Sequence, residues 1–98
     1  MTLEEFRGTL CNTSPPEDLP EPLQALWIEA NGDWDVAHRL VQHLPGADNA
    51  WVHAYLHRKE GDLGNATYWY RQANRPVGSG AHDDEWQTIA RELLGRLC

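Results

Sequence analysis

Apolar side chains recur with the period of an α-helix along most of the chain from residue 23 onward. Four consecutive segments show this spacing: Leu23, Leu26, Trp27 and Ala30; Trp34, Ala37, Val41 and Leu44; Trp51, Ala54 and Tyr55; Leu63, Ala66, Tyr70 and Ala73. The clearest apolar stripe comes last, in Trp86, Ile89, Ala90, Leu93, Leu94 and Leu97. The pattern predicts five helices, and the last of them, over residues 84–98, is expected to seal the core.

Residues that begin and end helices stand between these segments. Asn31-Gly32, Pro45-Gly46 and Gly61 are stop signals, and an aspartate suited to capping the next helix follows each of them, at Asp33, Asp48 and Asp62. In the N-terminal arm, residues 1–19, two hydroxyl-and-acid pairs predict short helical turns: Thr2 with Glu5, and Ser14 with Pro15 and Glu17. The Gly, Pro and Ser content of residues 75–80 predicts a loop.

An internal repeat relates the first two helices to the next two. Sliding the chain by 29 residues superposes Ala25 on Ala54, Gly32-Asp33 on Gly61-Asp62, and Ala37 on Ala66. Antiparallel helices need a small residue where their backbones approach, a glycine to end one helix and an aspartate to begin the next. The chain is therefore predicted to be a single all-α domain, residues 1–98. Two antiparallel helical hairpins, residues 23–73, are expected between the N-terminal arm and a C-terminal capping helix.

The repeated motif Gly-Asp-x-x-x-Ala, with a small residue seven positions before the glycine, resembles tetratricopeptide and Sel1-like helical repeats. Residues 66–73 are similar to the second helix of such a repeat. The period is 29 rather than about 34 residues, and two units are fewer than a solenoid needs, so the chain ends are expected to act as caps. The resemblance implies a concave groove for a protein or peptide, lined by Leu26, Glu29 and Ala30 and by Trp51, Tyr55, Arg58 and Lys59.

The stretch His53-Ala54-Tyr55-Leu56-His57-Arg58-Lys59-Glu60-Gly61-Asp62, followed by Asn65-Ala66 and Tyr68-Trp69-Tyr70, looks like a family of small, uncharacterised bacterial and fungal proteins. This second resemblance implies a helical fold and a soluble intracellular protein. It implies no particular activity.

Composition and charge narrow the class of protein. Leu and Ala outnumber Val and Ile by more than three to one, which favours helices over strands. The net charge of −7 disfavours nucleic acid and anionic membranes as partners. No run of about 18 apolar residues occurs, and the N-terminus does not have the pattern of a signal peptide. We therefore expect a cytoplasmic protein. Its two cysteines have no CxxC partner and are expected to be free thiols, because the reducing cytosol disfavours disulfides.

His53, His57 and Glu60 occupy positions i, i+4 and i+7 of the third predicted helix. On a helical wheel they lie opposite its apolar arc, where two imidazoles and a carboxylate one turn apart could bind a divalent metal such as zinc or nickel. The tetratricopeptide register gives a different position. It aligns His57 with Ile28, at a contact between helices, where it would be a hydrogen-bonded core histidine.

The sequence therefore leaves two functions open. No combination of residues has the spacing of a catalytic triad or a phosphate-binding loop, so no catalytic residue is assigned and an enzyme is not expected. The first expectation is a protein- or peptide-interaction module without a cofactor, with partner-binding residues Glu29, Trp51, Tyr55, Arg58 and Lys59. The alternative is a metal-binding protein or metal-dependent hydrolase that uses His53, His57 and Glu60. A homodimer formed through some of the five tryptophans is a further expectation.

Overall fold

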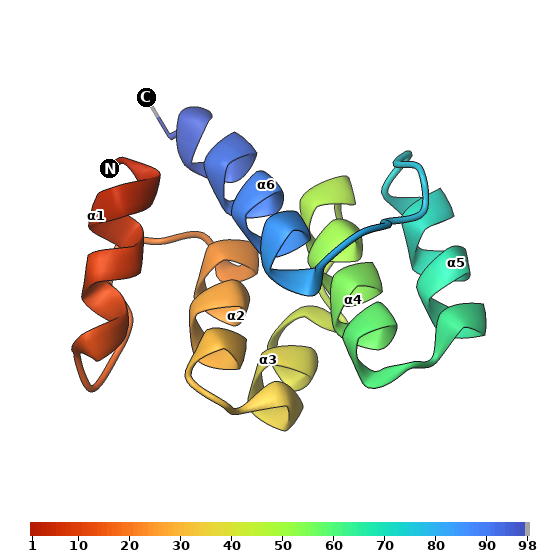
Figure 1. The fold of residues 1–98 in the computed structure, drawn as a ribbon, viewed down its shortest axis with the longest axis horizontal. Helices are drawn as coiled ribbons and strands as arrows, with labels where there is room; N and C mark the ends of the chain where they lie inside the picture. Colours follow the sequence, from red (N-terminus) through yellow and green to blue (C-terminus); the bar gives the residue numbers. More distant parts are fainter. Residues whose placement is uncertain (98) are drawn as a thin grey trace.

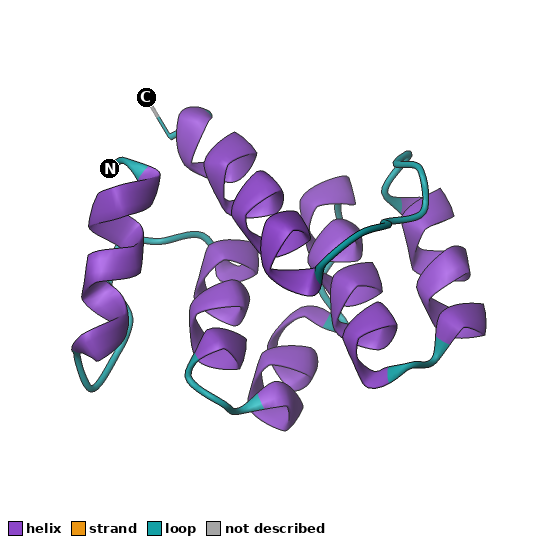
Figure 2. Ribbon diagram, in the orientation of Figure 1, coloured by secondary structure: helices purple, strands orange, loops and turns teal. Residues whose placement is uncertain are grey.

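The computed structural model describes residues 1–97, and all the regular secondary structure in this range is helical (Figure 2). Its elements are α1 (Leu3–Gly8), a 3₁₀ helix (Thr9–Cys11), α2 (Glu21–Ala30), α3 (Trp34–Val41), α4 (Ala47–Glu60), α5 (Leu63–Gln72) and α6 (His82–Gly95). The predicted all-α fold is confirmed. Within the same range, no helix combines the length and the apolar character that crossing a membrane requires.

Helix α4 lies at the centre of the molecule (Figure 1). It pairs with α5 as α2 pairs with α3, and it also contacts α2, α3 and α6. The C-terminal helix α6 returns across α2 and α4 and reaches α1, so the two chain ends lie on the same side of the molecule (Figure 1). A helix surrounded in this way has almost no face left for water, and the eight residues from Ala50 to His57 are all buried.

The turns within the two helical pairs have the geometry that the repeat predicts. Gly32 and Gly61 have φ angles of +93° and +91°, a conformation that glycine adopts without strain. After each of them an aspartate caps the next helix: a carboxylate oxygen of Asp33 accepts from the Val36 amide at 3.1 Å, and one of Asp62 accepts from the Asn65 amide at 3.3 Å. The four repeat alanines are at most 1% exposed: Ala25, Ala54, Ala37 and Ala66.

In the N-terminal arm, one of the two predicted helical turns is present. Thr2 and Glu5 form a reciprocal capping box at the start of α1. The second prediction, a helical turn at Ser14, is wrong, because residues 12–16 have no helix and Glu17 lies in a simple turn. Two consecutive prolines explain the difference, since a residue that precedes proline is sterically disfavoured in the helical conformation.

Several predicted boundaries and faces also need correction. Helix α3 ends at Val41, so Leu44 lies beyond it and is 37% exposed instead of packed. Helix α4 begins at Ala47 after Gly46, which places Asp48 inside the first turn and not at the cap. Leu63, expected to face the core, is 63% exposed at the start of α5.

The C-terminal helix begins earlier and ends earlier than the predicted range 84–98. It runs from His82 to Gly95, and Leu97 beyond it is 41% exposed. Cys98 lies outside the described residues. The helix still seals the core as expected: Trp86 stacks on Phe6 of α1, with 5.6 Å between ring centroids, and its indole nitrogen donates to the Leu26 carbonyl of α2 at 3.0 Å.

Candidate metal centre

Three histidines from two helices converge between α3 and α4. Nε2 of His53 lies 3.0 Å from Nε2 of His38 and 3.1 Å from Nε2 of His57. The centroids of the three rings are 4.7, 4.8 and 5.0 Å apart, close to an equilateral triangle. His53 and His57 are buried, at 4% and 8% exposure, and His38 is half-buried. The same nitrogen of each ring therefore faces one common point.

Hydrogen bonds between the three rings cannot satisfy all of their Nε2 atoms. Nδ1 of His57 lies 2.6 Å from a carboxylate oxygen of Glu60, which can only accept, so Nδ1 carries a proton and Nε2 of the neutral ring has a lone pair. A neutral imidazole nitrogen has either one lone pair or one proton. Nε2 of His53 therefore cannot make a full hydrogen bond to both His38 and His57. One metal cation would accept a lone pair from each of the three nitrogens at once.

A different neighbour holds each imidazole in place. The Trp34 ring stacks on His38 with 4.8 Å between centroids and an interplanar angle of 9°, and its indole nitrogen donates to the Leu56 carbonyl at 2.7 Å. Trp69 of α5 stacks on His53 at 4.1 Å and 23°. Glu60 holds His57 through Nδ1. This last contact is a carboxylate–histidine pair of the kind that orients metal-binding imidazoles in proteins.

The surroundings keep two of the histidines neutral. Burial, and after it the neighbouring His38 and His57, together lower the pKa of His53 from 6.5 to about 4. Burial, followed by the charge of His57, also lowers the pKa of His38. Neutral imidazole is the form that coordinates a metal, so at neutral pH these two rings already have the required protonation state.

The predicted metal ligands are partly revised by this geometry. His53 and His57 both belong to the converging group, and their role as metal ligands stays a prediction. Glu60 does not share their common point: its carboxylate lies on the Nδ1 side of His57, in a separate group with Asp62. The third converging nitrogen comes from His38, which was not among the predicted metal ligands. Its signal was a third histidine on α3, the helix that the repeat places beside α4.

The burial of His53 and His57 bears on the two positions that the sequence left open for them. The helical wheel put His53, His57 and Glu60 on the side opposite the apolar arc. At His53 and His57 this side is buried, because other helices pack against α4, whereas Glu60 is 38% exposed. The repeat register, which placed His57 at a contact between helices, agrees with its burial. A wheel identifies an exposed face only when a helix has one.

The residues predicted to bind a partner lie in the interior or in ion pairs, and α6 packs against α2 and α4, the helices expected to line the groove. The Tyr55 hydroxyl is buried and donates to Glu29 at 3.2 Å, and burial beside this carboxylate raises the pKa of Tyr55 far above its ordinary value. Lys59 forms an ion pair with Glu29, and Arg58 forms one with Glu85 of α6 at 2.8 Å.

Trp51, the remaining partner-binding candidate, is 6% exposed, and the Arg75 guanidinium lies 3.9 Å from the centroid of its ring. An aromatic platform of Trp51 and Tyr55 is therefore not open to a partner in this arrangement. Partner binding at these residues stays a prediction.

Comparison of the chain with models of known protein families, with curated proteins and with solved structures found no match. The two family resemblances seen in the sequence therefore stay predictions. The evidence for the candidate metal centre is therefore the geometry of its three histidines.

Proposed function

We propose that this protein binds one divalent transition metal ion through Nε2 of His38, His53 and His57. Zinc fits the donor set best, because it accepts three imidazole nitrogens in a tetrahedral arrangement and tolerates a site assembled from two helices. Imidazole also binds copper and nickel. The proposal therefore names the three ligands and a divalent transition metal, with zinc as the preferred element.

The convergence of the three Nε2 atoms is the observation that carries the proposal. A tetrahedral zinc ion with zinc–nitrogen distances of about 2.0–2.1 Å separates its nitrogen ligands by about 3.3 Å. The nitrogens of His38 and His57 lie 3.0 and 3.1 Å from that of His53. A movement of a few tenths of an ångström would bring both of these separations to the tetrahedral spacing.

The supporting contacts are those that a metal site needs. Glu60 accepts a hydrogen bond from Nδ1–H of His57, which leaves the Nε2 lone pair facing the common point and makes the imidazole a stronger donor. Trp34 and Trp69 restrict the rings of His38 and His53. Rings held in this way lose little conformational freedom on binding a metal, which favours affinity.

Metal analysis of tag-free protein tests the proposal. Protein stripped with a chelator and dialysed against Zn²⁺ should take up about one equivalent, as specific metal sites do. Replacing His38 by Ala should lower the affinity by at least tenfold, because two imidazoles remain. His38 is half-buried, so this variant is expected to keep the fold, which circular dichroism checks.

His82→Ala is the matched control, since His82 is exposed at the start of α6 and lies outside the group of converging histidines. It should bind zinc like the unmodified chain. Uptake below about a tenth of an equivalent, or equal zinc affinity of the His38→Ala and His82→Ala proteins, would refute the proposed site.

A further inference from the structure

The proposed centre has three protein donors, and a zinc ion prefers four ligands. Among residues 1–97, no carboxylate or cysteine joins His38, His53 and His57 within 4.8 Å of all three nitrogens. Glu60 is engaged on the far nitrogen of His57. Three protein ligands with a position left for water or substrate are typical of catalytic zinc sites, whereas structural sites close the fourth position with a further side chain.

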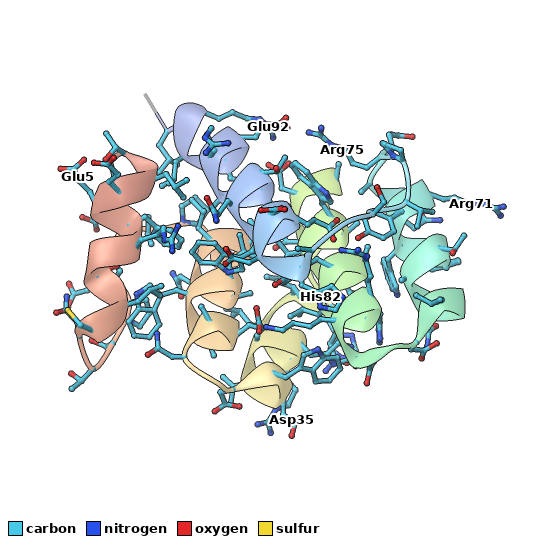
Figure 3. All side chains as sticks on the ribbon, viewed as in Figure 1. Glu5, Asp35, Arg71, Arg75, His82 and Glu92 are labelled. Atoms are coloured by element: carbon cyan, nitrogen blue, oxygen red, sulfur yellow. The ribbon has the colours of Figure 1, made fainter. Side chains whose placement is uncertain are left out.

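Solvent approaches the three histidines from the side of His38. His53 and His57 are buried, whereas His38 is half-buried and lines a shallow surface pocket of about 270 Å³ together with Asp35 and Arg39. Asp35 and Arg39 are both exposed, and Figure 3 shows Asp35 on the outer edge of α3. This pocket therefore lies beside His38, the histidine of the three that is not fully buried.

Building on the proposed metal site, we infer that the bound ion keeps an exchangeable fourth position, which opens toward this pocket and takes water or a small anion. Three neutral imidazoles leave both positive charges of the ion uncompensated by its protein ligands. Such an ion attracts anions and lowers the pKa of a bound water. The Arg39 guanidinium lines the same pocket as the Asp35 carboxylate, so it offsets the negative charge that an incoming anion would meet there.

Two neighbouring side chains would close the position if they moved onto the metal. Asp35 and His43 both influence the charge state of His38 electrostatically, and either supplies a suitable donor atom. Neither belongs to the converging group in this structure. A site closed by one of them would not exchange its fourth ligand with a small anion.

Cobalt(II) as the metal and azide as the anion test the inference. Cobalt(II) replaces zinc in imidazole sites and has visible absorption bands that depend on its ligands. Binding of one equivalent to stripped protein should produce intense bands, which measures the metal site itself. Azide should then shift these bands in a saturable way, which measures the fourth position. Arg39→Ala should weaken azide binding about three- to tenfold, since it removes one charge near the anion.

Arg91→Ala is the matched control, because Arg91 is an exposed arginine on α6, a helix that packs against α1, α2 and α4. It should leave the affinity for azide unchanged. Cobalt that binds without responding to azide would overturn the open position and leave the metal site standing. Failure of cobalt to bind would refute the proposed function, and the open position with it.

Discussion

Glu60 is the side chain on which the orientation of His57 depends. It is on the surface, 38% exposed, yet its carboxylate lies 2.6 Å from the buried nitrogen Nδ1 of His57. The neighbouring His53 has no equivalent partner: within residues 1–97, its buried Nδ1 makes no hydrogen bond, and stacking on Trp69 holds the ring. The two proposed ligands on α4 are thus positioned by different means, one by a hydrogen bond and one by packing.

This difference gives a prediction for Glu60. Replacing it by Gln keeps an acceptor for the Nδ1 proton but removes the charge that strengthens Nε2 as a donor. The affinity for zinc should fall by about 10- to 100-fold, as is typical when a carboxylate behind a metal-binding histidine is lost. Isothermal titration calorimetry measures it.

Glu4→Gln on α1 is a suitable control, because it removes the same charge from an exposed position far along the chain. It should bind zinc normally. If Glu60→Gln and Glu4→Gln have equal affinities, Glu60 does not act through His57.

At the scale of the helices, two helices pack closely only where the side chains between them are small. Ala66 of α5 and Ala37 of α3 are 1% and 0% exposed, at equivalent positions of the two helical pairs. A larger side chain there would push the helices apart, because protein interiors have almost no free volume. The spacing of α3 and α4 in turn sets the distance between His38 and the histidines of α4.

Ala66→Leu is therefore expected to lower the free energy of unfolding by about 1–3 kcal/mol. Urea denaturation followed by tryptophan fluorescence measures the change. The same substitution at Ala30, an exposed position near the end of α2, is the control and should change the free energy by less than about 0.5 kcal/mol. Equal effects at the two positions would show that Ala66 is not at a tight helix contact.

The sequence predicted local structure well where the cause lies within a few residues. Gly32 and Gly61 end helices and Asp33 and Asp62 begin them, because the required φ angle and the capping hydrogen bond are local. A local signal can also be wrong. Ser14 and Glu17 have the spacing of a capping box, but no helix forms there because two prolines follow Ser14.

The candidate metal centre could be predicted only in part, since the approach of its three histidines depends on how two helices cross. The spacing of His53 and His57 on one helix is a local pattern. Their approach to His38, 15 residues before His53, depends on the packing of α3 against α4. The burial of His53 and His57 could not be predicted from the wheel for a related reason: other helices pack against α4, and no local pattern shows how many neighbours a helix will have.

At the scale of the whole molecule, the buried histidines link stability to pH. In the unfolded chain a histidine has a pKa near 6.5, whereas in the folded protein the pKa of His53 is about 4 and that of His38 is also lowered. Between these values the unfolded state binds more protons than the folded state. The free energy of unfolding of the metal-free protein should therefore fall as the pH drops from 6.5 toward 4.

Denaturation at a series of pH values in the presence of a chelator checks this prediction. His53→Phe keeps an aromatic ring against Trp69 and removes the titrating group, so its stability should depend less steeply on pH in this window. Carboxylates contribute to acid unfolding in both proteins and do not affect the comparison. Identical slopes for the two proteins between pH 6.5 and pH 4 would contradict the assignment to His53.

The central claim is that three of the five histidines bind one metal ion through Nε2. Long-range ¹H–¹⁵N NMR of the imidazole rings, recorded before and after one equivalent of Zn²⁺, tests it most directly because it reports each ring nitrogen separately. The Nε2 resonances of His38, His53 and His57 should shift to the metal-bound range, with a proton on Nδ1 of His57, while those of His43 and His82 stay unchanged. Unchanged spectra, or shifts confined to His43 and His82, would contradict the account.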